Sequence, residues 1–215
     1  LIKIDTNGAI APTDVTDDLQ RAIDQLFLND STKDGPNSRV ILHFGPGEYY
    51  ISKELRIPSY TYISGAGIDS TIIHMAGSDA EGAMIRTVDS NSVPGSYTPF
   101  ASMNYSLRPK FIVIENLTFK TDLEEPIVLL DNADNVTFDH VKFSGSYSTF
   151  KVQPIGSDHA DTTVHTAVLS RRTSGIHRPE NITFSSCVFN RTGFGFFSKS
   201  DHNNVYFVNC QFYEL

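Results

Sequence analysis

The chain has 215 residues, 40% of them hydrophobic and 20% charged, which is too apolar for a disordered chain and too mixed for a membrane protein. Its formal net charge is −8 at pH 7, and the sequence contains no basic cluster, so we expect no binding to nucleic acid. No apolar run approaches the roughly 18 residues that a membrane-spanning helix needs, so we expect no membrane insertion. The length suits one large domain or two small ones.

The first predicted element is an amphipathic helix over residues 14–28. Acidic residues at its start, Asp17 and Asp18, favour the positive end of the helix dipole. Its apolar positions recur at helical spacing. These positions are Leu19, Ala22, Ile23, Leu26 and Phe27. We expect no second helix of comparable quality.

From residue 39 onward, short strand-like runs alternate with turn residues. Runs of β-branched and aromatic residues bounded by glycine and proline are typical of strands. The runs are 39–44, 49–51, 54–57, 61–63 and 71–75, and they are separated by turns at 45–47, 58–59 and 65–67.

The second half of the chain contains an internal repeat. Four segments consist of asparagine, two further residues and phenylalanine: 116–119, 135–138, 181–184 and 204–207. Their asparagines are 19, 46 and 23 residues apart. If one coil takes about 23 residues, the gap of 46 residues holds either two coils or one coil with a long insertion. The polar segment 147–164 is the predicted insertion.

Each repeat places alternate apolar side chains on one side, and it cannot bury that side alone. Stacking in register buries it, with phenylalanine on phenylalanine and valine on isoleucine, and sends the backbone hydrogen bonds to the coils above and below. The pattern therefore predicts a parallel β-solenoid. The recurring asparagine suits a tight bend, where its amide can bond to its own copy in the next coil.

The sequence resembles the right-handed parallel β-helices of the pectate-lyase-like superfamily, in the branch of phage tailspikes and polysaccharide-processing proteins. The resemblance covers nearly the whole chain and is most specific at 14–23, 40–51, 61–67 and 70–73. It implies an all-β solenoid: a single-stranded right-handed parallel β-helix with an N-terminal capping α-helix. We expect one domain over 1–215, with the cap at 14–28 and coils over 39–215. A cap agrees with the physics, because the first coil exposes strand edges.

Two cysteines, Cys187 and Cys210, occupy equivalent positions in successive repeats. A disulfide and a metal pair are both alternatives. We interpret the cysteines as core thiols, because parallel side chains in adjacent coils match disulfide geometry poorly and neither has a metal-spaced partner. We expect no metal and no cofactor.

Candidate catalytic residues lie in the predicted insertion and before the last repeat. They are Asp158, His159, Asp161 and Asp201. Carboxylates several ångströms apart can serve as acid and base in glycosidic cleavage. The alternative is a solvated loop that merely carries such residues. The Gly-His-Gly and paired-aspartate motifs of polygalacturonase-like hydrolases are missing from the sequence.

Candidate glycan-binding residues are Phe194, Phe196, Arg171 and Arg172. Segment 193–197 is unusually aromatic, and strand alternation would turn some rings outward, where they can stack on sugar faces. Core packing or a subunit interface is the alternative for these rings. Either arginine is also a candidate for proton abstraction in a lyase reaction.

These features favour a virion-associated tailspike or tail fibre that binds host-surface polysaccharide, located in the virion tail or outside the cell. The expected partners are polysaccharide, further copies in a homotrimer, and other virion or tail proteins. The alternatives are an extracellular polysaccharide lyase or glycoside hydrolase, and a purely structural surface or filament protein. Because no polar cap follows the last repeat, we expect a longer β-helix or an end that a partner chain covers.

Overall fold

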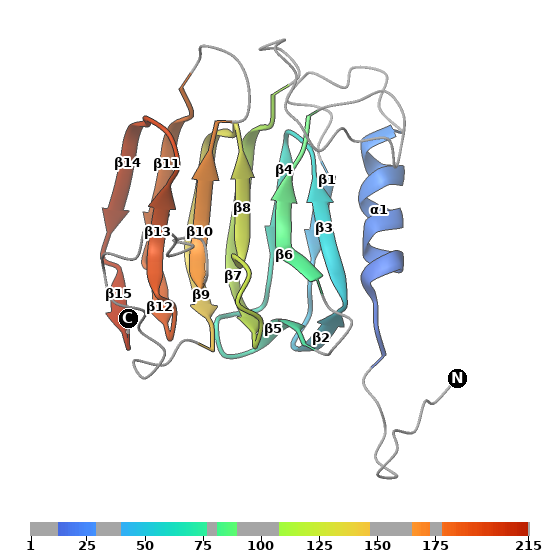
Figure 1. The fold of residues 1–215 in the computed structure, drawn as a ribbon. Coiled ribbons are helices and arrows are strands. Elements are labelled where there is room, and N and C mark those ends of the chain that lie inside the picture. The colour runs from blue at the N-terminus through green and yellow to red at the C-terminus, as the bar shows by residue number, and fades with distance from the viewer. Residues whose placement is uncertain are drawn as a thin grey trace.

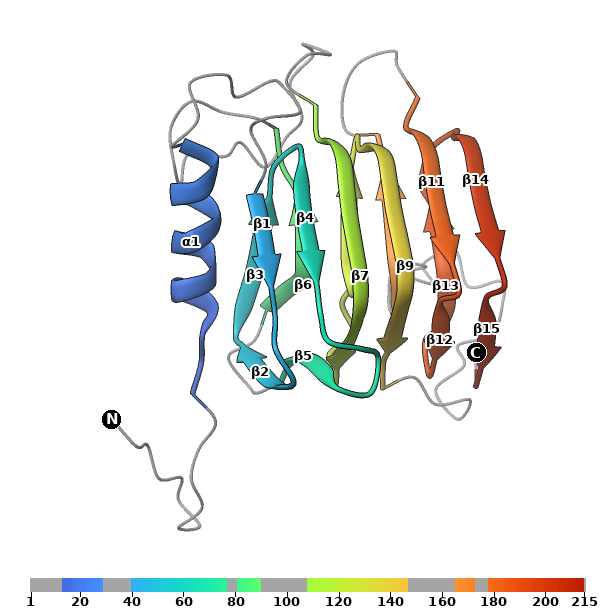
Figure 2. The same cartoon turned by 180° about the vertical axis from the view of Figure 1, so that it is seen from behind.

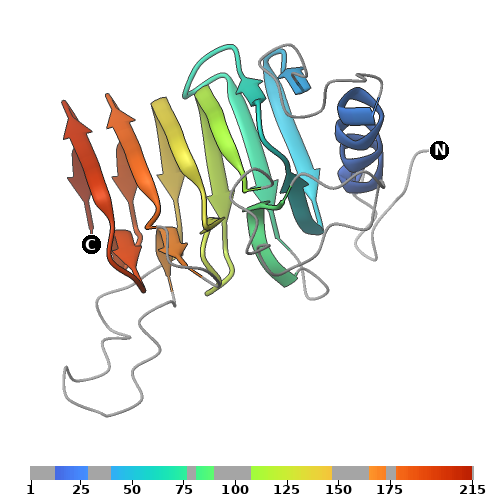
Figure 3. The same cartoon turned by 90° about the horizontal axis from the view of Figure 1, so that it is seen from above.

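The computed structural model describes residues 13–28, 40–76, 81–89, 108–146, 165–172 and 178–214. In this part of the chain, strands that pair in parallel form a stack, with α1 (Thr16–Leu28) at one end (Figures 1 and 2). Seen from above, the stack ends opposite α1 at β14 (Asn203–Val208) and β15 (Gln211–Tyr213) (Figure 3). The predicted all-β parallel β-helix with an N-terminal helix is thus confirmed.

The strands form three walls around the core. The first wall contains β1 (Val40–His43), β4 (Thr61–Ser64), β11 (Glu180–Ser185), β14 and the first halves of β7 (Lys110–Thr121) and β9 (Asp134–Ser144). The second wall contains β2 (Gly47–Ile51), β5 (Thr71–Met75), β12 (Val188–Asn190), β15 and the second halves of β7 and β9. The third wall contains β3 (Lys53–Ile57), β6 (Glu81–Thr87), β8 (Val128–Asp131), β10 (Thr166–Arg171) and β13 (Phe194–Ser198).

The corner between the first and second walls is a column of residues with positive φ. β7 turns at Asn116 (φ 56°) and β9 turns at His140 (φ 51°). The equivalent residues of the next two coils, Ser186 and Asn209, have φ values of 52° and 53°. Residues other than glycine seldom adopt this conformation, so the stacked neighbours hold the bend in place.

The predicted asparagine ladder is present, but it contains one member fewer than expected. The Asn181 amide donates to Asn135 Oδ1 (3.1 Å), and the Asn204 amide donates to Asn181 Oδ1 (3.0 Å). Asn116 lies outside this ladder, because the register of β7 and β9 aligns it with His140 at the next corner. The prediction that 116–119 is an equivalent copy is therefore wrong. Asparagine tolerates positive φ at either corner, so the motif does not identify the corner.

The gap of 46 residues between Asn135 and Asn181 holds one coil. Ile182 pairs directly with Val136, so no further coil lies between β9 and β11. The two-coil alternative is wrong, and the coil carries an insertion. The predicted insertion, 147–164, lies outside the described residues.

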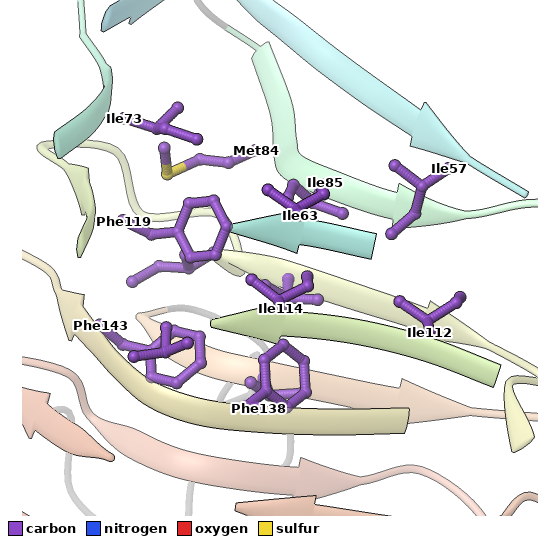
Figure 4. Close-up of a cluster of buried hydrophobic side chains, with 14 of the residues drawn as sticks. Ile57, Ile63, Ile73, Met84, Ile85, Ile112, Ile114, Phe119, Phe138 and Phe143 are labelled. Carbon is purple, nitrogen blue, oxygen red and sulfur yellow. The ribbon is translucent and has the colours of Figure 1, made fainter. Parts of the chain in front are cut away.

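Two columns of stacked phenylalanine rings fill the core of the later coils. Phe184 lies between Phe138 and Phe207, with ring centroids 5.1 and 4.7 Å away. A second column contains Phe143, Phe189 and Phe212. These spacings match the distance of about 4.8 Å between neighbouring strands, which confirms the predicted ladders. Figure 4 shows the core of the earlier coils, where the labelled residues include Ile57, Ile63, Ile85, Ile112, Ile114 and Phe119.

Both cysteines are free thiols at equivalent positions of adjacent coils. The Cys187 thiol donates to the Phe138 carbonyl oxygen (3.4 Å), and the Cys210 thiol donates to that of Phe184 (3.5 Å). Burial raises the pKa of Cys187 to about 12. The core-thiol interpretation is thus confirmed for Cys187, which is fully buried. Cys210 is only partly buried and packs against the core from the last described coil.

The helix α1 covers the first coil and also satisfies part of its strand edge. Ile23 is fully buried against the core. The Gln20 side chain accepts a hydrogen bond from the Arg56 backbone N–H (2.8 Å) and donates to its carbonyl oxygen (3.1 Å), as a neighbouring strand would. The Ser52 N–H donates to the Thr16 hydroxyl (2.8 Å). None of the described residues forms a helix long and apolar enough to span a membrane.

Replacing Gln20 with alanine should lower the free energy of unfolding by about 1 kcal/mol, because two hydrogen bonds to the β3 edge are exchanged for bonds to water. Urea unfolding followed by circular dichroism measures the change. Gln25→Ala is the matched control, because Gln25 is an exposed residue of the same helix. Equal unfolding midpoints for the two variants would show that the Gln20 amide does not support the edge.

Candidate active site

Three of the predicted catalytic residues, Asp158, His159 and Asp161, lie outside the described residues. The fourth, Asp201, follows β13. Its side chain is 73% exposed and forms an ion pair with Arg178, with Oδ2 and Nη2 3.6 Å apart. Within the described part of the chain, Asp201 is therefore a surface residue in an exposed ion pair.

The two predicted glycan-binding rings of β13 point in different directions. Phe196 packs inward, with its ring centroid 5.8 Å from that of Phe184. Phe194 is 42% exposed, and its centroid lies 5.4 Å from that of Phe197. Phe196 thus fits the core-packing alternative, whereas Phe194 is exposed to solvent.

Of the two predicted arginines, Arg171 is the last residue of β10 on the third wall and Arg172 follows it. Arg171 donates through Nε and Nη2 to the Asp131 carboxylate, and this hydrogen bonding to Asp131 raises the pKa of Arg171. A guanidinium that holds its proton so firmly suits anion binding better than proton abstraction. Arg172 is exposed.

The outer face of the second wall carries a polar row that sequence analysis did not single out. Tyr50 of β2, His74 of β5 and Lys120 of β7 are register partners in successive coils. Their strand neighbours, such as Ile73 and Phe119, are buried in the core. Because side chains alternate along a strand, the row faces outward.

His74 is held at one ring nitrogen, and the other has no hydrogen-bond partner among the described residues. Its Nδ1 lies 2.9 Å from Glu48 Oε1, and its side chain is only 10% exposed. The carboxylate only accepts hydrogen bonds, so in the neutral ring the proton sits on Nδ1 and Nε2 presents a lone pair. Nε2 is buried without a hydrogen-bond partner, and Asp122 Oδ2 lies 3.8 Å away, beyond hydrogen-bond distance.

Tyr50 and Lys120 supply a proton donor and a cation beside His74. The Tyr50 and His74 ring centroids are 5.2 Å apart. Burial raises the pKa of Tyr50, as do its hydrogen bond to Glu48 and the charge of that carboxylate, so the phenol keeps its proton. Lys120 Nζ lies 3.9 Å from Glu48 Oε1.

The row, together with Glu48, brings a base, an acid and a cation together on one rigid wall. A base and an acid flanking one bond are what general acid–base catalysis requires. Within the described ranges, no group of three histidine, cysteine or carboxylate side chains could hold a metal ion. The sequence signal for this site is weak. Glu48, Tyr50 and His74 are polar residues at outward positions of their strands, but no sequence motif connects them.

A known protein family matches nearly the whole chain. The model of one family, described as rhamnogalacturonase A/epimerase, pectate lyase-like, matches residues 4–215. No curated protein matches the chain.

Two solved structures are similar to this chain. A candidate glycosyl hydrolase from Parabacteroides merdae has a TM-score of 0.55 at 17% identity, covering 98% of this chain and 92% of that one. ORF18 of Geobacillus virus E2 has a TM-score of 0.54 at 16% identity, covering 94% of this chain and 39% of the viral chain. At these identities the likeness concerns the fold alone.

Replacing Glu48 with glutamine should lower the pKa of Tyr50 toward its ordinary value. The substitution removes the negative charge and the strong acceptor that disfavour the phenolate, while burial remains. Titration of ¹³C-labelled tyrosine by NMR measures the shift. Glu125→Gln, at an exposed residue of the β7–β8 connection, should leave it unchanged. A Tyr50 pKa that is the same in all three proteins would contradict the described contact with Glu48.

Proposed function

Because the chain belongs to the rhamnogalacturonase A/epimerase family of pectate-lyase-like proteins, we propose that it binds an acidic polysaccharide and cleaves it by β-elimination. The observation that carries this proposal is the geometry of His74, oriented through Nδ1 by Glu48 and unpartnered at Nε2. A buried polar atom without a partner is rare in folded proteins and needs a role. Abstraction of a proton from the substrate would give His74 Nε2 such a role.

In the proposed reaction, His74 Nε2 removes the proton from the sugar carbon that bears the carboxylate. The electron pair of that C–H bond forms a carbon–carbon double bond, and the neighbouring glycosidic C–O bond breaks. The Tyr50 hydroxyl gives its proton to the leaving oxygen. Lys120 pairs with the substrate carboxylate and stabilises the negative charge that develops on it.

Two features of the site support this assignment of roles. Asp122, whose Oδ2 lies 3.8 Å from Nε2, is 68% exposed and can turn aside without disturbing the core. The substrate must be a uronate, because a neutral sugar has no carboxylate to make the adjacent C–H bond acidic. The cation at Lys120, 43% exposed, fits such a carboxylate.

His74→Asn should lower the rate of cleavage of a polyuronate at least 100-fold, the usual contribution of a positioned base. The measurement is the ultraviolet absorbance of the unsaturated sugar formed. Tyr50→Phe should have an effect of similar size. The matched control is His43→Asn, because His43 lies on the first wall, hydrogen-bonded to Ser64. Reducing ends that appear without unsaturation would indicate a glycoside hydrolase, and full activity of His74→Asn would remove His74 from the mechanism.

The fold of the viral neighbour supports a second proposal, that the protein is a virion-associated tailspike or tail fibre. In this setting the β-helix is a homotrimer, works beside other virion or tail proteins and binds host-surface polysaccharide. Light scattering after size-exclusion chromatography should then give three times the mass of the chain. A monomeric mass would contradict the tailspike proposal and favour an extracellular enzyme. A trimer that neither binds nor cleaves glycan would indicate a structural protein.

A further inference from the structure

The polar row of Tyr50, His74 and Lys120 continues in both directions along the second wall. Away from α1, Lys120 is the register partner of Ser144, and Ser144 is the partner of Asn190. Toward α1, Tyr50 pairs with Asp14 through a parallel β-bridge. Figure 2 shows the strands that carry the row, from β2 near α1 to β12. We name this series the extended row, and its members in order are Asp14, Tyr50, His74, Lys120, Ser144 and Asn190.

The charge of the extended row changes sign from one end to the other. Asp14, at the α1 end, accepts hydrogen bonds from the Thr16 N–H (2.9 Å) and the Ser52 hydroxyl (2.5 Å). Burial acts to raise the pKa of Asp14, but these hydrogen bonds lower it overall, so the carboxylate keeps its negative charge. The cation Lys120 lies on the other side of His74. The row therefore repels an anionic polymer at the α1 end and attracts it beyond His74.

Neighbouring charges do not reverse this difference. In the first turn of α1, Asp17 pairs with Lys53, with Oδ1 and Nζ 3.8 Å apart. Asp18 pairs with Arg21 on the same helix. These two pairs are neutral as units. Glu48, which contacts His74, adds a further negative charge on the α1 side of the row.

A second cation, Lys142, lies beside the extended row one coil after Lys120. Lys142 is on β9 and is the register partner of Thr118 on β7. Its strand neighbours, Val141 and Phe143, are fully buried, so Lys142 faces outward. Lys142 forms no ion pair with the described residues, and its charge is therefore available to a bound anion.

The order of roles along the row determines the direction in which the substrate lies. In the proposed lyase reaction, Tyr50 protonates the leaving oxygen, His74 removes the proton from the next sugar and Lys120 pairs with the carboxylate of that sugar. The leaving oxygen becomes the reducing end of the departing fragment. The sugar that loses its proton becomes the unsaturated non-reducing end of the retained fragment. The retained fragment thus extends from Lys120 toward Lys142, and the departing fragment lies over Tyr50 and Asp14.

We propose that Lys142 binds the next uronate of the retained fragment and that the acidic α1 end keeps the departing fragment short, so that the protein shortens a polyuronate from its non-reducing end. This inference rests on the function proposed above. Neighbouring strands are about 4.8 Å apart, close to the length of one sugar ring, so successive sugars meet successive coils. Beyond Lys142, Ser144 and Asn190 offer uncharged hydrogen-bonding groups to the sugar hydroxyls.

The cleavage products of oligogalacturonates test the direction. The oligomers carry a fluorescent label at the reducing end, and the products are separated by length. The label should stay on a fragment that becomes shorter by about one or two sugars at a time, because the acidic end excludes a longer departing fragment. Random internal cleavage would overturn the proposal, as would early appearance of the label on the shortest products.

Two variants test the residues. Lys142→Gln should raise KM for these oligomers about fivefold with a smaller effect on kcat, because Lys142 binds a sugar away from the broken bond. Asp14→Asn should lengthen the departing fragments, and asparagine keeps an acceptor for the hydrogen bond that begins α1. The matched controls are Arg21→Gln and Asp18→Asn, which make the same changes of charge at exposed residues of α1. If both variants behave like their controls, the proposal is wrong.

Binding measured by isothermal titration calorimetry separates this proposal from the lyase activity. In a His74→Asn background, Lys142→Gln should weaken the binding of trigalacturonate about fivefold, whereas Asp14→Asn should not weaken it. Unsaturated products from the wild type, together with unchanged affinity in Lys142→Gln, would overturn the role of Lys142 and leave the lyase proposal intact. If no polyuronate is cleaved, the lyase proposal fails, and the calorimetry still decides whether Lys142 binds the anionic sugar.

Discussion

The whole structure depends on the in-register stacking of parallel coils. The strands of the inner coils exchange backbone hydrogen bonds with the coils on either side, and the same register brings Phe184 directly between Phe138 and Phe207. A shift of one residue would turn the ladders outward and bury the polar residues, so the hydrophobic pattern strongly specifies the register. No strand of the described ranges pairs with the outer edge of the first coil, and α1 supplies contacts there, in part through Gln20.

The same register determines what lies outside. When inward residues stack, the residues between them also form rows, at the spacing of the strands. The row of Tyr50, His74 and Lys120 arises in this way, as does the pairing of Arg56 with Arg86 on the third wall. Side chains on such walls are preorganised, because buried carboxylates such as Asp131 hold them in position and the strands cannot move independently.

Much of the fold follows from local sequence. The helix is visible from its apolar stripe, and the strands, the phenylalanine columns and the asparagine ladder are visible from the repeat, because a period of two is a local property of the chain. The corner of the coil that Asn116 occupies cannot be read from the local sequence. Asn116 lies at the second corner, although its segment matches those of Asn135 and Asn181, since the bends on both sides of the first wall accept asparagine with positive φ.

The sequence by itself thus determined the architecture: parallel coils, an apolar interior of stacked rings and a helix at the first coil. Only the tertiary structure decided which surface residues meet. His74 lies 26 residues from Glu48, and Arg171 lies 40 residues from Asp131, yet both pairs are in contact. The sequence shows no basic cluster, but the third wall assembles one. The physical reason is that coils differ in length through their insertions, so the spacing along the chain does not reveal which outward residues share a row, whereas the stacked core aligns them.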